Sequence, residues 1–121
     1  MFGFEKLDVW QKAIELSDSV YAFTRQFPSE ERYGLTSQLR RSSVSVASNI
    51  AEGSGRGSNP DFARFVEIAY GSLMELVTQI KIASRQGFLA KDTYDDAYAK
   101  SEAISRMLSG LRSSLSKPDK R

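Results

Sequence analysis

Apolar side chains recur every three or four residues along four long stretches of this 121-residue chain. This spacing puts the apolar groups on one face of an α-helix, and it predicts helices near residues 8–26, 35–55, 60–86 and 91–115. No stretch shows the period-two alternation that is typical of a half-buried strand. The predicted inner positions are, in chain order, Val9, Ala13, Leu16, Val20, Phe23 and Phe27; Leu35, Leu39, Ser42 or Ser43, Val46 and Ile50; Phe62, Phe65, Ala69, Leu73, Leu76, Ile80 and Ala83; and Tyr94, Ala97, Ser101, Ile104, Leu108, Leu111 and Leu115.

Proline, glycine and capping residues mark the ends of these helices. Asp8 is a good N-cap for the first, and Pro28 stops it because the residue before a proline is driven out of the helical region. Asn59 followed by Pro60 predicts the start of the third helix, with Asn59 as its N-cap. Gly87 predicts its end.

Four helices of this length with short connections favour antiparallel neighbours. We therefore predict an all-α fold, an antiparallel up-and-down four-helix bundle. The chain is short enough for a single domain over residues 1–121, and we expect frayed ends near 1–5 and 117–121.

The second and third predicted helices have features beyond those of a simple bundle. The second carries many small or polar residues, which allow a neighbouring helix to approach closely. The third is apolar around much of its circumference, since Val66, Tyr70 and Val77, with Ile68 and Ile82, lie beside its main stripe. A helix of this kind is covered on more than one side, which favours a homo-oligomer.

Composition argues against enzymatic chemistry. The chain has no cysteine and no histidine, so it lacks thiolates and both the commonest general base and the commonest metal ligand. Asp95 and Asp96 are adjacent on a helix and do not face each other as paired acid–base groups would. We expect no catalytic residues, no metal site and no cofactor.

The N-terminal sequence lacks the basic region and apolar run of a signal peptide, and no stretch approaches the roughly 18 apolar residues of a membrane span. These features predict a cytoplasmic protein without membrane contact.

The formal charge of +2 is unevenly distributed, because residues 38–91 carry seven cations against four anions. Basic groups in this region are candidates for phosphate contact. They are Arg40, Arg41, Arg56, Arg64, Lys81 and Arg85.

Several of these positions have structural interpretations as well. Adjacent helical residues point about 100° apart, so either Arg40 and Arg41 contact phosphate, or one pairs with Glu52 or Glu75 while the other is solvated. Polar residues at an otherwise apolar contact can fix register and oligomeric state. The candidates for such a network are Gln38, Asn49, Glu52 and Glu75.

A glycine-rich connection and a set of aromatic residues leave further alternatives. The run 53–58 with the following helix start is either an anion site near Arg56 or a simple interhelical connection. The aromatic side chains either stack on bases or pack in the core or at an interface, and packing is the better account for those on helical stripes. They are Trp10, Tyr21, Tyr70, Tyr94 and Tyr98, of which Tyr98 lies off the main stripe.

Three segments carry a family resemblance: FEKLDVWQKA, YGLTSQLRRSSVSVASNIAEGSGR and FARFVEIAYGSLMEL. Together they resemble the four-helix-bundle proteins encoded within intervening sequences of 23S ribosomal RNA genes. The resemblance extends from Phe4 to Leu115. The matching positions are Gln38, Leu39, Arg40, Arg41, Asn49, Ile50, Ala51, Glu52 and Gly53 in the second helix and Phe62, Arg64, Phe65, Gly71, Ser72 and Glu75 in the third.

This resemblance implies a small cytoplasmic bundle that assembles into a ring-like homopentamer. A related branch, the accessory variability proteins of diversity-generating retroelements, implies binding to nucleic acid and to a reverse transcriptase. We therefore expect a non-enzymatic oligomer that binds structured RNA or a ribonucleoprotein. The alternative is a protein–protein adaptor that docks a polymerase or another helical partner with little nucleic-acid contact.

Overall fold

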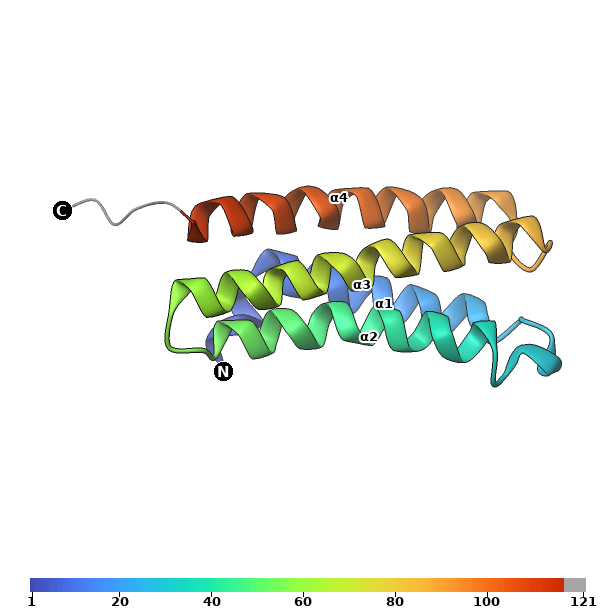
Figure 1. The fold of residues 1–121 in the computed structure, drawn as a ribbon. Coiled ribbons are helices and arrows are strands. Elements are labelled where there is room, and N and C mark those ends of the chain that lie inside the picture. The colour runs from blue at the N-terminus through green and yellow to red at the C-terminus, as the bar shows by residue number, and fades with distance from the viewer. Residues whose placement is uncertain (117–121) are drawn as a thin grey trace.

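The computed structural model describes residues 1–116, and its regular elements are all helical. The long helices are α1 (Asp8–Thr24), α2 (Leu35–Ser54), α3 (Asn59–Arg85) and α4 (Lys91–Leu115), with short 3-10 helices η1 (Gly3–Lys6) and η2 (Ser29–Glu31). Successive long helices run in opposite directions, as Figure 1 shows. The predicted up-and-down four-helix bundle is confirmed for the part of the chain that the structure describes.

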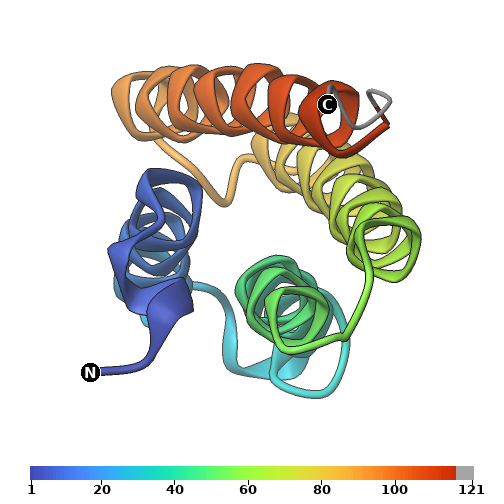
Figure 2. The same cartoon turned by 90° about the vertical axis from the view of Figure 1, so that its left-hand side faces the viewer.

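The four helices surround one core. Each of α2 and α4 contacts both α1 and α3, and the contact between α2 and α3 is the most extensive. Figure 2 shows this ring nearly along α2, with α4 crossing over α1 and α3 at an angle. α2 therefore packs against α1 on one side and against α3 on the other.

The predicted inner stripes form the core. Leu16, Leu39, Leu73 and Ile104 have almost no exposed surface, and they belong to four different helices. Six of the predicted inner positions are only half-buried: Phe23, Leu35, Phe62, Tyr94, Leu111 and Leu115. Ile68 and Ile82, which the sequence placed beside the stripe of α3, remain 44% and 45% exposed.

Two predicted helix caps were wrong by one residue. Ser58, rather than Asn59, is the N-cap of α3, and its Oγ accepts the backbone N–H of Asp61 at 3.3 Å. Asp8 is the first residue of α1 and not its cap, which is Leu7. Gly87 does follow α3 as predicted, with a φ of +80° that favours glycine.

The N-terminal residues contact the bundle through aromatic side chains. Within the stretch expected to fray, η1 places the Phe4 ring edge-on to Trp10, with centroids 5.2 Å apart. The C-terminal stretch 117–121, also expected to fray, lies outside the described residues. None of the helices described within residues 1–116 combines the length and the apolar character that crossing a bilayer requires.

Candidate nucleic-acid interface

The flank of α2 that faces α3 is a line of hydrogen-bonded polar side chains, here called the polar seam: Ser42, Ser45, Asn49, Ser72 and Gln79. The Oγ atoms of Ser45 and Ser72 lie 2.8 Å apart and join the two helices. Asn49 Nδ2 donates to the carbonyl of Ser45 at 2.8 Å. These residues satisfy one another within the interhelical contact, as buried polar groups require.

Ser42 and Gln79 are the most buried pair of the polar seam, at 6% and 8% exposure. The Oγ of Ser42 lies 2.7 Å from Gln79 Oε1 and 2.8 Å from the carbonyl of Gln38. A single hydroxyl proton serves one of these acceptors; both contacts are satisfied when the Gln79 carboxamide is turned so that its N–H donates to Ser42. The pair therefore ties α2 to α3 in one register.

Close backbone approach at Gly53 continues this contact toward the α2–α3 connection. A Cβ at this position would lie 2.6 Å from Phe65 Cβ and 3.0 Å from Phe62 Cδ1. Real Cβ atoms are not found that close to a neighbouring carbon, so only glycine fits without movement of α3. The prediction of a close neighbour for α2 is confirmed here.

The residues predicted to form a structural polar network separate into two places. Asn49 belongs to the polar seam, and Gln38 and Glu75 line its outer opening, a groove of about 520 Å³ that also includes Arg41. Glu52 lies elsewhere, at the C-terminal end of α2, where its Oε1 is 3.0 Å from Nη2 of Arg56.

The other flank of α2, toward α1 and η2, is a groove of about 590 Å³. We call it the arginine groove; its lining includes Tyr21, Arg32, Tyr33, Thr36, Arg40 and Arg41. Three of its lining residues are arginines and none is acidic. The groove is therefore a locally cationic surface on a chain of low net charge.

Arg40 is held in place by neutral partners. Its Nε donates to Thr24 Oγ1 at 2.9 Å, and its Cζ lies 4.7 Å from the centroid of the Tyr21 ring. Within the described chain Arg40 does not pair with Glu52 or Glu75, so the structural alternative of an arginine–glutamate pair stays a prediction for Arg41, which shares a groove with Glu75. Arg40 itself lies on the α1 side of α2, whereas Glu75 lies on the α3 side.

The other predicted basic residues do not join this groove. Arg56 and Arg64 flank the Phe65 ring, at 4.6 Å and 5.1 Å from its centroid, near the opposite end of α2. Lys81 Nζ lies 4.8 Å from the centroid of the Tyr94 ring, and Arg85 is exposed in the last turn of α3. The six candidates thus occupy three separate places instead of one patch.

In the glycine-rich connection, the groups named by the anion hypothesis have contacts within the chain. Arg56 is paired with Glu52 at the surface, and the Ser58 side chain accepts one N–H of the first turn of α3. These contacts favour the alternative of a simple interhelical connection. No group of three or more acidic, histidine or cysteine side chains gathers as a metal site within residues 1–116.

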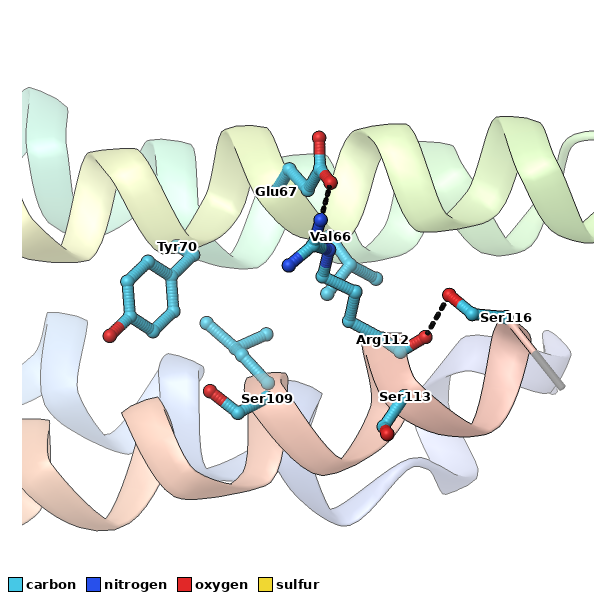
Figure 3. A pocket seen from close by; sticks show the side chains of 8 residues that line it. Val66, Glu67, Tyr70, Ser109, Arg112, Ser113 and Ser116 are labelled. Atoms are coloured by element: carbon cyan, nitrogen blue, oxygen red, sulfur yellow. Dashed lines mark hydrogen bonds and ion pairs between the residues drawn. The ribbon is translucent and has the colours of Figure 1, made fainter.

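A third groove lies between α3 and α4, and its arginine is paired with a carboxylate. Figure 3 shows Glu67, Val66 and Tyr70 of α3 opposite Ser109 and Arg112 of α4. Arg112 forms an ion pair with Glu67 across this groove of about 810 Å³. Its charge is balanced, unlike the charges of the arginine groove.

Sequence reasoning missed two residues of the arginine groove. Arg32 and Tyr33 lie in the turn before α2, with the Arg32 Cζ 6.0 Å from the Tyr33 ring centroid. Tyr33 is 88% exposed, far more than any other tyrosine of the described chain. The sequence did contain a signal for them, because an arginine and a tyrosine are adjacent in a connection between helices. No apolar helical stripe accounts for residues at these positions.

These features define a four-helix-bundle protein with a polar interhelical contact on one side of α2 and a cationic groove on the other. A solved structure from Bacteroides thetaiotaomicron, described as a protein of unknown function from the S23 ribosomal protein family, has the same fold, with a TM-score of 0.80 and 21% identity over 86% of this chain and 97% of that one. The family model described as 23S rRNA-intervening sequence protein matches residues 5–110. This chain belongs to that family, as its sequence motifs predicted. No curated protein matches it.

Proposed function

We propose that this protein is a non-enzymatic homo-oligomer, a pentamer by family resemblance, that binds structured RNA or a ribonucleoprotein. The observation that carries the binding part is the arginine groove, whose three arginines have no carboxylate beside them in the lining. Cations free of carboxylates are available to phosphate groups, which dominate affinity for nucleic acid. The name of the family, which refers to a ribosomal RNA, supports the same class of partner.

The assembly part is supported by the outer face of α3. Exposed residues recur there at alternating steps of four and three, the spacing of a helix that packs along another helix. This outer stripe of α3 consists of Arg64, Ile68, Gly71, Glu75, Thr78, Ile82 and Arg85. Ile68 and Ile82 are nearly half exposed in the single chain, so a second copy that covers them would bury apolar surface.

Oligomerisation would also compensate for the low charge of the chain. Each copy contributes a formal +2 and one arginine groove. A ring of five copies repeats the groove five times, and contacts that are weak singly then act together. Multivalent binding of this kind requires no large basic patch on one subunit.

Light scattering tests the assembly. We expect a mass near five times 13.5 kDa for the wild type and a lower mass for Ile82→Glu, which puts a charge on the outer stripe of α3. Ile14→Glu is the matched control, because Ile14 is 37% exposed on α1 and lies outside that stripe. A monomeric wild type at micromolar concentration would refute the oligomer.

A salt titration with a labelled, blunt-ended RNA hairpin tests the binding. Phosphate contacts predict a linear loss of log affinity with log salt concentration. Arg41→Gln should weaken binding and reduce that slope, because it removes a cation from the arginine groove. Arg106→Gln, on the exposed face of α4, is the control and should change neither.

The adaptor hypothesis replaces RNA with a helical protein such as a polymerase. The outer stripe of α3 favours it as a second candidate, since such a stripe also fits a partner helix in place of a second copy. A protein that binds neither the hairpin nor single-stranded RNA at low salt would refute the RNA proposal, and a monomer with that behaviour would support the adaptor.

A further inference from the structure

The arginine groove combines cations with an exposed aromatic ring, and this combination goes beyond what phosphate contact requires. We propose that the groove takes an unpaired nucleotide of RNA, with its phosphate on Arg40 and Arg41 and its base stacked on Tyr33. The proposal rests on the proposed RNA-binding function and names the part of the RNA that this groove recognises. A blunt duplex, whose bases are covered by their neighbours, cannot make the stacking contact.

The size of the groove suits one nucleotide. Its volume of about 590 Å³ is within the range of about 300–1,000 Å³ that is usual for small-ligand sites. An extruded or single-stranded nucleotide is the part of an RNA that fits this space.

Arg40 is pre-organised for a phosphate. The hydrogen bond from Nε to Thr24 and the stacking on Tyr21 fix the plane of its guanidinium group. The structure records no partner for its terminal N–H groups among residues 1–116, so a phosphate can accept from both in bidentate geometry. A guanidinium that is already oriented loses less conformational entropy on binding than a freely rotating one.

Tyr33 is placed as a stacking surface instead of a core residue. Its ring is 88% exposed, and its neighbour Arg32 lies within cation–π range of it. Aromatic rings and arginine planes are the surfaces on which unpaired bases stack. The nearby Glu31 does not oppose this role, because its Oε1 is directed to the N–H of Leu35 at the start of α2, 3.2 Å away.

Two labelled probes test the proposal: a short oligouridylate, which is single-stranded, and a blunt-ended RNA duplex of two strands, which has no loop. Base stacking on an aromatic residue predicts that Tyr33→Ala weakens oligouridylate binding by about tenfold, while Tyr33→Phe retains it. The duplex affinity should be unchanged in both variants. Tyr98→Ala is the matched control, because Tyr98 is an exposed tyrosine on α4, away from the groove.

The outcomes separate this inference from the function on which it rests. Equal oligouridylate affinity for the wild type and Tyr33→Ala, with the duplex still bound, would overturn the nucleotide site and leave the RNA proposal standing. Failure of the wild type to bind either probe would overturn both. Polyglutamate that competes fully with oligouridylate and loses affinity equally in Tyr33→Ala would assign the groove to an acidic peptide and overturn the inference.

Discussion

The two flanks of α2 differ in how completely their polar side chains are satisfied within the chain, although the α1 side has internal contacts too, such as Arg40 to Thr24. Toward α3, the polar seam satisfies its serine, asparagine and glutamine groups with one another, and Ser42 contacts Gln79 at 2.7 Å. Toward α1, the arginine groove has three arginines without carboxylates, a hydroxyl of Thr36 without a partner, and an exposed Tyr33 ring. Both flanks belong to the same helix and are about equally rich in polar residues.

The difference shows how a polar residue can be assigned to structure or to binding. Polar groups that complete their hydrogen bonds within the chain stabilise and align the contact that contains them. Buried polar groups without hydrogen-bond partners lower the stability of the folded protein unless another molecule supplies the missing hydrogen bonds. By this criterion the α3 flank is structural, and the α1 flank is the surface at which we propose binding.

The largest expected effect is at Gly53, where the structural flank is tightest. Gly53→Val should lower the free energy of unfolding by about 3 kcal/mol, because its Cβ would meet Phe65 Cβ at 2.6 Å and α2 and α3 would have to separate. Urea denaturation at fixed protein concentration measures this loss.

Gly110→Val provides the control for that substitution. Gly110 lies in α4, and a Cβ there would meet nothing within 4 Å. We expect a change within about 0.5 kcal/mol, as for other surface substitutions. Similar stabilities of the two variants would contradict the close approach of α2 to α3.

A smaller effect is expected at Ser42. Ser42→Ala removes the partner of the buried Gln79 carboxamide, so the free energy of unfolding should fall by about 1–2 kcal/mol. Ser48→Ala, on the exposed face of α2, is the control and should have almost no effect. Equal effects of the two substitutions would mean that the polar seam does not stabilise the α2–α3 contact.

The sequence was sufficient to predict the helices because the signals for them are local. Apolar spacing located all four, and Pro60 and Gly87 marked the limits of α3. The caps were displaced by one residue because Ser58 and Asn59 are both good capping residues, and only the backbone decides between them. The exposure of Ile68 and Ile82 shows which part of the broad apolar surface of α3 the single-chain core does not use.

The candidate site was only partly predictable, since grooves depend on contacts between helices. Sequence could name Arg40 and Arg41 as cations, but it could not show that Arg40 would face Tyr21 and Thr24 of α1. It also missed Arg32 and Tyr33, because a turn gives no periodicity from which to read a direction. The sequence therefore identified candidate residues by their chemistry, but it could not show which side chains contact each other across different helices.

The sign of the effect at Thr36 tests the comparison most directly, although its size is small. Thr36→Val replaces an unpartnered buried hydroxyl by a methyl group of similar shape, so the free energy of unfolding of the RNA-free protein should rise by about 1 kcal/mol. Thr24→Val is the same substitution on a satisfied hydroxyl, which donates to the Val20 carbonyl at 2.6 Å and accepts from Arg40. It should destabilise by about 1–2 kcal/mol. If both variants lost stability, Thr36 would be satisfied in the free protein, and the distinction between the two flanks of α2 would not hold.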